Sequence, residues 1–313
     1  IRDVAPSRGL GDVYKRQSVK SKLFSPSDIQ SIMKKAMVER LKAQYEISWF
    51  PEDGENFPVR VFLMKDEVTV GLDSTGESLH KRGYRKLTAK APIAENLAAA
   101  LIELTPWNAG RILVDPFCGS GTIPIEAALI ARNIAPGVFR KGFAFEKWVD
   151  FDSEMFDEIY NDDSQEREFA HKIYGYDNNP KANEIATHNI KAAGVSKDIV
   201  LKLQPFQQFE QPQEKSIIIT NPPYGERIST NDLLGLYQMI GERLKHAFVG
   251  NEAWVLSYRE ECFDQIGLKA SQKVPLFNGP LECEFRKYEI FDGKYKEFKS
   301  CLLYTSPSPR DGA

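Results

Sequence analysis

Cysteine and histidine are both scarce in this sequence, with four residues of each among 313. The cysteines form no CxxC pair and no zinc-binding spacing, and the histidines form no cluster, so the sequence predicts no metal site. A disulfide framework is not expected either. Scattered free cysteines fit a reducing, cytoplasmic compartment.

Long apolar runs are missing as well. No run approaches the about 18 residues that a membrane-spanning helix needs, and no signal-peptide pattern is visible. A strong excess of one charge sign is also absent, because the formal net charge is −3. Residues 18–90 nevertheless carry 13 basic residues against 10 acidic ones. A nucleic-acid partner would therefore be bound locally, near this part of the chain, and the alternative is ordinary surface charge.

The two ends of the chain, residues 1–17 and 301–313, are similar to translated sequencing adapters of the transposon type. We expect them to be tails that do not belong to the folded protein. The alternative is a natural disordered tail at each end. Residues 18–300 are long enough for one large domain and a smaller piece.

A glycine-rich turn follows a short apolar run at residues 112–114. The run is typical of a buried strand, Asp115 ends it, and residues 123–131 have the periodicity of a helix. Gly119 and Gly121 allow positive φ and close approach of a ligand to the backbone. A strand, a glycine-rich turn and a helix N-terminus together suit a nucleotide-like ligand, although such turns often only join two elements.

A second apolar strand, residues 216–220, runs directly into Asn221, Pro222, Pro223 and Tyr224. The two prolines fix φ and stiffen the turn, which holds the Asn221 amide and an aromatic ring at the strand's end. In open α/β sheets, ligands bind outside the C-terminal ends of the strands. We therefore expect this turn and the glycine-rich turn to face the same crevice.

Here the chain resembles the class I S-adenosylmethionine-dependent methyltransferases that act on an exocyclic amine. The resemblance rests on the glycine-rich turn and on the Asn-Pro-Pro-Tyr motif together. It implies S-adenosylmethionine as the cofactor and Asn221, Pro222, Pro223 and Tyr224 as the catalytic residues. The cofactor-binding residues that it implies are Pro92, Ile93, Asp115, Phe117, Gly119, Gly121, Thr122, Asp177 and Asn178.

Asp177 ends another apolar strand, residues 172–177, and can accept hydrogen bonds from both ribose hydroxyls of a nucleoside. The alternative is that it caps the helix that follows, which we expect to stop near Gly194. Many methyltransferases have an acid after the next strand, where it contacts the adenine amine. This chain instead has glutamines after the strand at 199–203, and we take Gln207 as the candidate for the adenine contact.

Residues 18–78 contain a predicted helix that starts at Ser25, followed by two strands at 59–64 and 68–72. The second strand alternates as a half-buried strand should. A helix and a hairpin bury too little surface to fold well alone. The segment resembles the end of a THUMP domain, an RNA-binding module found fused to methyltransferases.

A basic linker, residues 79–91, is similar to the junction in bacterial THUMP-containing rRNA methyltransferases. Its candidate RNA-binding residues are Lys81, Arg82, Tyr84 and Arg85, because cations reach phosphates and an aromatic ring stacks on a base. The alternative is a solvated linker without function. The resemblance also implies a helix from Pro92 to Leu104 against the cofactor site.

Residues 92–300 alternate strands and helices, which predicts an α/β fold with a doubly wound, mostly parallel sheet of the class I methyltransferase type, with seven strands. We expect a charged helix at 153–171 and a terminal antiparallel hairpin near 273–290. The remaining expected elements are helices at 233–248 and 260–266 and a strand at 253–258.

The Asn-Pro-Pro-Tyr turn suggests the chemistry. The Asn221 side-chain carbonyl and the Pro222 backbone carbonyl can accept the two hydrogens of an aromatic amine and favour positive charge on its nitrogen. The Tyr224 ring can stack on the base. Cys118 could act as a nucleophile, but its place in the cofactor turn favours a packing role.

The expected function is methylation of a base in RNA, and the resemblance favours N2 of a guanine in 23S rRNA. One alternative is an N6-adenine methyltransferase, and another is a protein glutamine methyltransferase, since both share the motif. A third is an RNA-binding assembly factor that uses the fold only as a scaffold. The sequence does not determine the oligomeric state.

Overall fold

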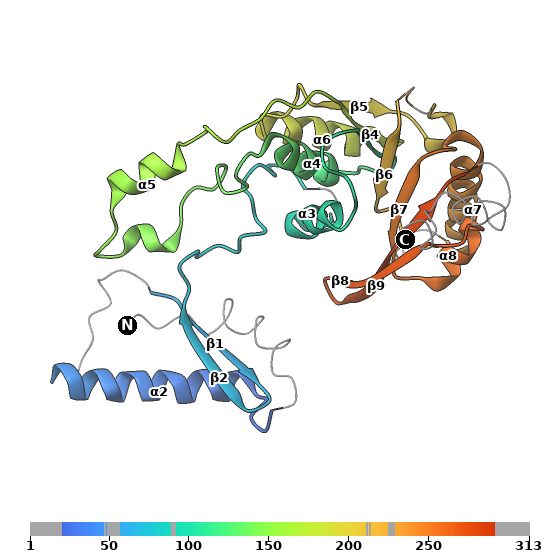
Figure 1. Ribbon diagram of the computed structural model, residues 1–313. Helices are drawn as coiled ribbons and strands as arrows, with labels where there is room; N and C mark the ends of the chain where they lie inside the picture. The colour runs from blue at the N-terminus through green and yellow to red at the C-terminus, as the bar shows by residue number, and fades with distance from the viewer. Residues whose placement is uncertain are drawn as a thin grey trace, which may run out of the picture. The chain divides into compact units, whose positions relative to one another are not determined.

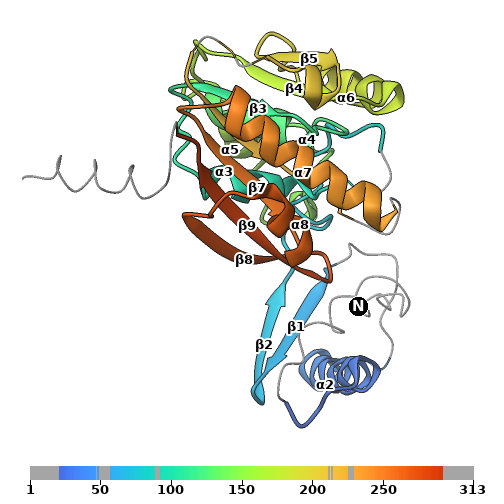
Figure 2. The same ribbon diagram turned by 90° about the vertical axis from the view of Figure 1, so that its right-hand side faces the viewer.

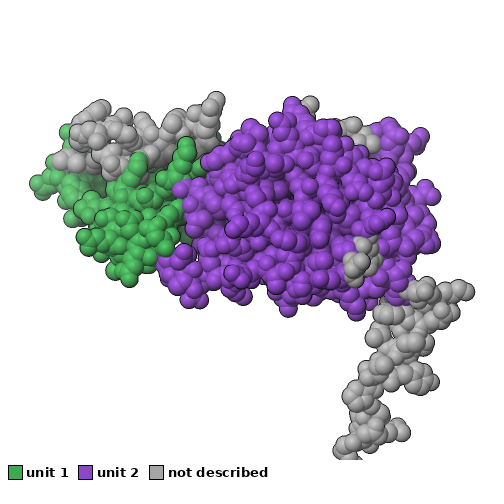
Figure 3. Space-filling model, turned by 90° about the horizontal axis from the view of Figure 1, so that it is seen from above, with its two compact units in different colours: residues 1–79, 141–161 green, residues 80–140, 162–313 purple. Residues whose placement is uncertain are grey.

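The computed structural model describes residues 21–46, 48, 57–88, 92–210, 212, 214–224 and 229–291 (Figure 1). The chain divides into two compact units, coloured separately in Figure 3. The first contains residues 1–79 and 141–161, and the second contains residues 80–140 and 162–313. The two adapter-like tails lie outside the described residues. The segment 141–161, which the sequence assigned to the larger domain, belongs to the first unit.

The first unit contains the helix α2 (Pro26–Tyr45) and the hairpin of β1 (Val59–Met64) and β2 (Glu67–Leu72). The predicted helix start is confirmed, because the Ser25 hydroxyl accepts a hydrogen bond from the Asp28 amide. Ile29 of α2 packs against Val61 and Leu63 of β1. The expectation of a half-buried second strand is wrong: every residue of β2 is exposed, since α2 packs on β1.

The segment 141–161 contains a short 3-10 helix, η1 (Ala144–Lys147), and α5 (Ser153–Tyr160). The predicted helix at 153–171 is therefore too long. It ends at Tyr160, and the Asp162 carboxylate then accepts a hydrogen bond from the Ser164 amide, two residues on. This local bond offers the backbone an alternative to the helix.

The second unit is built on a seven-stranded sheet in the order β5-β4-β3-β6-β7-β9-β8. The five strands from β5 to β7 are parallel, whereas β9 is antiparallel to β7 and to β8. The predicted fold class is confirmed. The strands are β3 (Ile112–Asp115), β4 (Ile173–Asp177), β5 (Ile199–Leu203), β6 (Ser216–Thr220), β7 (Glu252–Ser257), β8 (Gln272–Asn278) and β9 (Leu281–Glu289).

Helices cover both faces of this sheet, and each face has its own apolar core. Leu113 of β3 belongs to the core beneath α3, α4 and α6, whereas Ile112 and Val114 belong to the core beneath α7 and α8. Figure 2 shows α7 across one face. The helices are α3 (Glu95–Glu103), α4 (Thr122–Arg132), α6 (Pro180–Ala192), α7 (Thr230–Ala247) and α8 (Glu260–Ile266), with the 3-10 helix η2 (Phe206–Gln208) after β5.

The helix α7 packs closely against α8 at Gly241, where an added Cβ would lie 2.0 Å from the backbone oxygen of Ile266. Gly235 lies on the same helix, and nothing stands within 4 Å of its Cβ position. We expect Gly241→Ala to lower the free energy of unfolding by about 1–3 kcal/mol or more. Gly235→Ala should raise it by about 0.5–1 kcal/mol. Urea unfolding of both variants measures this, and equal effects would contradict the close packing.

Candidate active site

The predicted crevice lies at one edge of the sheet. Strands β4, β3 and β6 are neighbours and parallel, so their C-terminal ends meet at that edge. These ends carry Asp177, Asp115 and Thr220, and Asn221 follows at once. The structure therefore brings the glycine-rich turn and the Asn-Pro-Pro-Tyr turn side by side.

Asp115 connects the two turns through hydrogen bonds. It is 1% exposed, and its Oδ1 accepts hydrogen bonds from the Thr220 hydroxyl at 2.7 Å and from the Phe117 amide at 3.2 Å. Burial raises the pKa of Asp115 to about 7, while the two hydrogen bonds act against this rise. This position suits a residue that orders both turns, and direct contact of Asp115 with a cofactor stays a prediction.

The glycine-rich turn uses its two glycines differently. Gly119 has φ of 54° and open space around its Cβ position, so the turn presents bare backbone there. Gly121 has φ of 81°, and an added Cβ would lie 3.2 Å from the Ala186 Cβ of α6. Gly119 therefore leaves room for a ligand, and Gly121 allows α4 to start close to α6.

Asp177 is attached to the same turn. Its Oδ2 accepts a hydrogen bond from the Gly119 amide at 3.0 Å, and its Oδ1 accepts one from the Asn179 amide at 2.8 Å. The residue that caps α6 is Asn179, whose side chain accepts from the Lys181 and Ala182 amides. The helix-capping alternative for Asp177 is therefore wrong. The carboxylate is partly exposed beside the open Gly119, which suits a ribose ligand, and exposed Asn178 follows it.

The region after β5 contains glutamine side chains next to a pair of packed phenylalanine rings. Gln207 is exposed on η2, whereas Gln204 donates to the Gln208 carbonyl at 2.7 Å. Next to Gln207, Phe206 is buried and meets the Phe117 ring edge to face, with ring centres 5.7 Å apart. The exposed amide of Gln207 suits a contact with adenine, and that contact stays a prediction.

The side-chain oxygen of Asn221 is buried and, among the described residues, lacks a hydrogen-bond partner. The Asn221 side chain interacts with the Tyr224 hydroxyl, but its Oδ1 is inaccessible to solvent and has no hydrogen-bond partner within the part of the chain that the structure describes. A buried acceptor without a partner is costly, and such groups are often explained by a missing ligand. A substrate amine that reached this oxygen would supply the missing donor.

Tyr224 is fixed by a residue that the sequence reasoning missed. Its hydroxyl accepts a hydrogen bond from Asn278 Nδ2 at 2.7 Å, and its ring meets the Tyr258 ring edge to face at 5.5 Å. Burial raises the pKa of Tyr224 to about 12, so the phenol is neutral at physiological pH. Asn278 is the last residue of β8, in the hairpin that the sequence predicted, but no motif marked it as a site residue.

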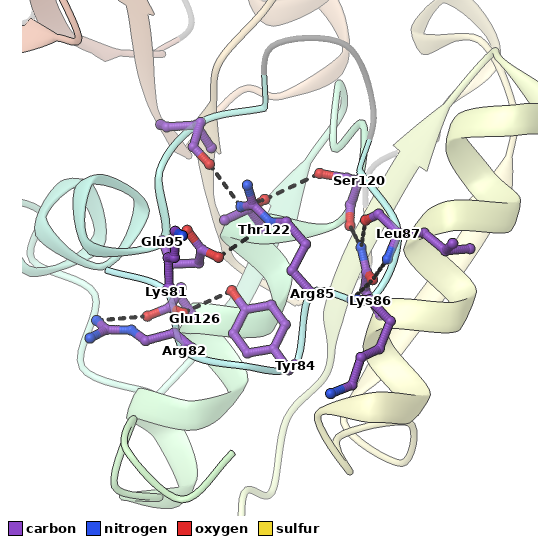
Figure 4. Close-up of polar contacts among 12 residues, drawn as sticks. Lys81, Arg82, Tyr84, Arg85, Lys86, Leu87, Glu95, Ser120, Thr122 and Glu126 are labelled. Atoms are coloured by element: carbon purple, nitrogen blue, oxygen red, sulfur yellow. Dashed lines mark hydrogen bonds and ion pairs between the residues drawn. The ribbon is translucent and has the colours of Figure 1, made fainter. Parts of the chain in front are cut away.

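The basic linker does not form the exposed RNA-binding surface that we expected. Tyr84 is fully buried, and its hydroxyl donates to Glu126 at 2.8 Å, so the prediction that its ring stacks on a base is wrong (Figure 4). Arg82 pairs with the same Glu126 at 3.3 Å, and Arg85 pairs with Glu95 at 3.4 Å.

These pairs partly neutralise the two arginine charges, because Glu126 and Glu95 are buried beside them, and contact of either arginine with RNA stays a prediction. Lys81 is exposed, and its contact with RNA stays a prediction. Pro92 and Ile93 precede α3, which starts at Glu95 and not at Pro92 as expected. Ile93 is buried, and its contact with a cofactor also stays a prediction.

Cys118 is buried in the glycine-rich turn, and burial raises the pKa of its thiol well above the ordinary value. This supports the packing role. Among the described residues, no group of three or more histidines, cysteines and acids could hold a metal ion. No helix within those residues is long and apolar enough to cross a membrane.

Two protein families match the chain. The RMKL-like methyltransferase domain matches residues 82–287, which include the glycine-rich turn, Asp177 and the Asn-Pro-Pro-Tyr turn. This chain belongs to that family. The THUMP domain matches residues 14–73, which include α2 and the β1–β2 hairpin. The family resemblance inferred from the motifs is confirmed.

Known relatives support the same assignment. The chain is 38% identical over 295 residues to "Putative RNA methyltransferase YpsC" of Bacillus subtilis (strain 168), covering 92% of this chain and 75% of YpsC. It is 37% identical over 249 residues to "Ribosomal RNA large subunit methyltransferase K/L" of Vibrio campbellii (strain ATCC BAA-1116). That match covers 77% of this chain and 35% of the relative, so the chain spans about a third of the K/L enzyme.

A solved structure shows the ligand class. The chain matches the crystal structure of SMU.472, "a putative methyltransferase complexed with SAH", with a TM-score of 0.79 and 36% identity, over 88% of this chain and 75% of that one. The cofactor of this family is S-adenosylmethionine. The bare Gly119 backbone, the partly exposed Asp177 carboxylate and the exposed Gln207 amide fit such a nucleoside.

The buried position of Asp115 predicts a pH effect on stability. Since its pKa is raised to about 7, the folded protein binds this proton more tightly than the unfolded chain does. The folded state therefore loses stability as the pH rises from about 4 to about 7. Asp115→Asn can accept the same two hydrogen bonds and does not titrate.

We expect the free energy of unfolding of the unsubstituted protein, relative to Asp115→Asn, to fall between pH 5 and pH 8. Each unit of pKa difference corresponds to about 1.4 kcal/mol. Chemical unfolding of both proteins at several pH values measures the difference. A difference that does not change with pH would show that Asp115 titrates like an exposed carboxylate.

Proposed function

We propose that this protein transfers a methyl group from S-adenosylmethionine to the exocyclic amine of a base in RNA, and that the base is a guanine methylated at N2 in large-subunit rRNA. The observation that carries the proposal is the buried, unpartnered Oδ1 of Asn221, next to the glycine-rich turn. An aromatic amine supplies the donor that this oxygen lacks.

The chemistry needs a better nucleophile than an aromatic amine normally is, because its lone pair is delocalised into the ring. Asn221 Oδ1 and the Pro222 carbonyl can accept its two hydrogens, which favours a pyramidal nitrogen and the positive charge that develops on it. S-adenosylmethionine, when bound, supplies an electrophilic methyl group on a sulfonium. The new carbon–nitrogen bond forms as the carbon–sulfur bond breaks, and the amine then loses one proton to water.

Tyr224 is 9% exposed, and the accessible part of its side chain would orient the base. The hydrogen bond from Asn278 and the contact with Tyr258 hold the Tyr224 ring in place. The ring is therefore already oriented before substrate binds. The neutral phenol cannot act as a base at physiological pH, which agrees with a positioning role. No strong base is required, because the methylated amine cation is very acidic.

The choice of RNA rests on relatives, and the choice of guanine rests on the family resemblance of the motifs. YpsC is named as an RNA methyltransferase, the K/L enzymes are named for the large ribosomal subunit, and the THUMP domain supports an RNA partner. Adenine N6 presents the same kind of amine to Asn221 and is the alternative. A non-catalytic assembly factor would not need the buried acceptor, and we therefore disfavour it.

Asn221→Ala tests the mechanism. We expect it to keep the affinity for S-adenosylhomocysteine, measured by calorimetry, and to lower the methylation rate at least about 10²–10³-fold, because one buried transition-state hydrogen bond is worth about 3–4 kcal/mol. Asn231→Ala, at an exposed position of α7, is the matched control and should change neither quantity. An Asn221→Ala variant with the normal rate would refute the role of its carbonyl.

The product decides the substrate. Ribosomal RNA treated with the protein and S-adenosylmethionine, then digested and analysed by mass spectrometry, should contain N2-methylguanosine. Recovery of N6-methyladenosine would replace the guanine assignment while leaving the mechanism in place. Methylated glutamine in a ribosomal protein fraction would overturn the RNA substrate altogether.

A further inference from the structure

A segment behind the cofactor turn has contacts that methyl transfer alone does not explain. The strap, residues 82–87, is the part of the basic linker that runs along α4 and α6 (Figure 4). Hydrogen bonds hold it at two places. At one place the strap bonds to Glu126 of α4. At the other it bonds to Asn189 of α6 and to Thr122, which link it to the glycine-rich turn.

The fastening on the turn includes Asn189 of α6, which is 0% exposed. Its Oδ1 accepts from the Lys86 amide at 3.2 Å and the Leu87 amide at 3.3 Å. Its Nδ2 donates to the Leu87 carbonyl at 3.1 Å and to the Ser120 carbonyl at 3.2 Å. One buried amide thus ties the strap backbone to the residue between Gly119 and Gly121. Three of the four bonds involve the strap, and the fourth joins Asn189 to the turn itself.

Arg85 makes the second contact with the turn. Its Nη2 donates to the Thr122 hydroxyl at 2.8 Å and to the Ile93 carbonyl at 2.8 Å, and its Nε lies 3.4 Å from the buried Glu95. Thr122 is the first residue of α4, and its hydroxyl also lies 3.3 Å from the Ser120 hydroxyl. The guanidinium therefore fixes the end of the turn where the helix begins.

The turn needs such support because of its own backbone. Gly119 and Gly121 both have positive φ, and Gly119 has open space around its Cβ position, so side-chain packing does not hold the turn at Gly119, although backbone bonds at Cys118 and Gly121 do contribute. The Gly119 amide donates to the Asp177 carboxylate, which holds that end of the turn. Asn189 bonds to the Ser120 carbonyl and Arg85 bonds to the Thr122 hydroxyl, on the side of the turn where the strap lies.

We propose that Asn189 and Arg85 are positioning residues of the cofactor site, through which the strap sets the shape of the glycine-rich turn. A turn held in its binding shape before the cofactor arrives costs less to order on binding. This inference rests on the proposed function only in taking the turn as the cofactor site. It also gives the basic linker a role other than the predicted contact with RNA.

The other fastening supplies a matched control. The Tyr84 hydroxyl and Arg82 bond to Glu126, which lies inside α4 and one turn beyond Thr122. These contacts hold the strap but do not touch residues 118–122. Tyr84→Phe removes one buried hydrogen bond of the strap and should therefore lower stability without altering the turn.

The experiment compares Asn189→Ala, Arg85→Met and Tyr84→Phe in the full chain, with S-adenosylhomocysteine as the probe. Calorimetry should show the dissociation constant raised at least about tenfold for the first two variants, which is about 1.4 kcal/mol. It should stay within about twofold for Tyr84→Phe. Hydrogen exchange without ligand should be faster at the amides of residues 119–122 in the first two variants alone.

If Arg85→Met does not fold, Arg85→Lys keeps the charge beside Glu95 but cannot make both Nη2 contacts, and it should weaken binding by a smaller factor. Unchanged affinity and unchanged exchange in the folded variants would overturn the proposal and leave the strap a purely structural element. Failure of the unsubstituted protein to bind S-adenosylhomocysteine would instead count against the proposed function. The hydrogen-exchange measurement would still test whether the strap sets the shape of the turn.

Discussion

The hydrogen bond from the Thr220 hydroxyl to the buried Asp115 carboxylate connects the two halves of the proposed site. It can form because β3 and β6 pair in parallel, although more than a hundred residues separate Asp115 from Thr220. Through Asp115 the bond reaches the Phe117 amide at the start of the glycine-rich turn, and through Thr220 it reaches Asn221. In the proposed mechanism, this one buried contact places the turn that would hold the methyl donor beside the Asn221 oxygen that would accept the amine hydrogens.

Most of the larger unit could be predicted from local patterns. The apolar runs at 112–114 and 216–220 became fully buried central strands, since strands covered on both faces lack polar residues. Gly194 and Asn179 set the ends of α6 through short-range chemistry. The failures concern burial that depends on distant partners. The strand β2 has a half-buried pattern, but among the described residues the apolar cluster of α2 is formed with β1.

The site was predictable where a motif carries the chemistry and not where long-range pairing decides. The composition around Tyr84 gave no indication that its ring would be buried and its hydroxyl would bond to Glu126, which is 42 residues away. Asn189 looks like one more polar residue of an exposed helix face, yet it is fully buried between the strap and the turn. Asn278 acquires a role only when the hairpin brings it to the Tyr224 hydroxyl. Each of these residues is explained by a contact that sequence spacing does not reveal.

A crystal structure of this protein with S-adenosylhomocysteine tests the central claim most directly, because it locates the ligand relative to both turns. The account predicts the ribose hydroxyls at the Asp177 carboxylate, the amino-acid end over Gly119, and the sulfur atom on the side that faces Asn221 Oδ1. It also predicts that the Thr220–Asp115 bond persists. Ligand bound elsewhere, or bound with its sulfur directed away from Asn221, would contradict the claim that the two turns form one site.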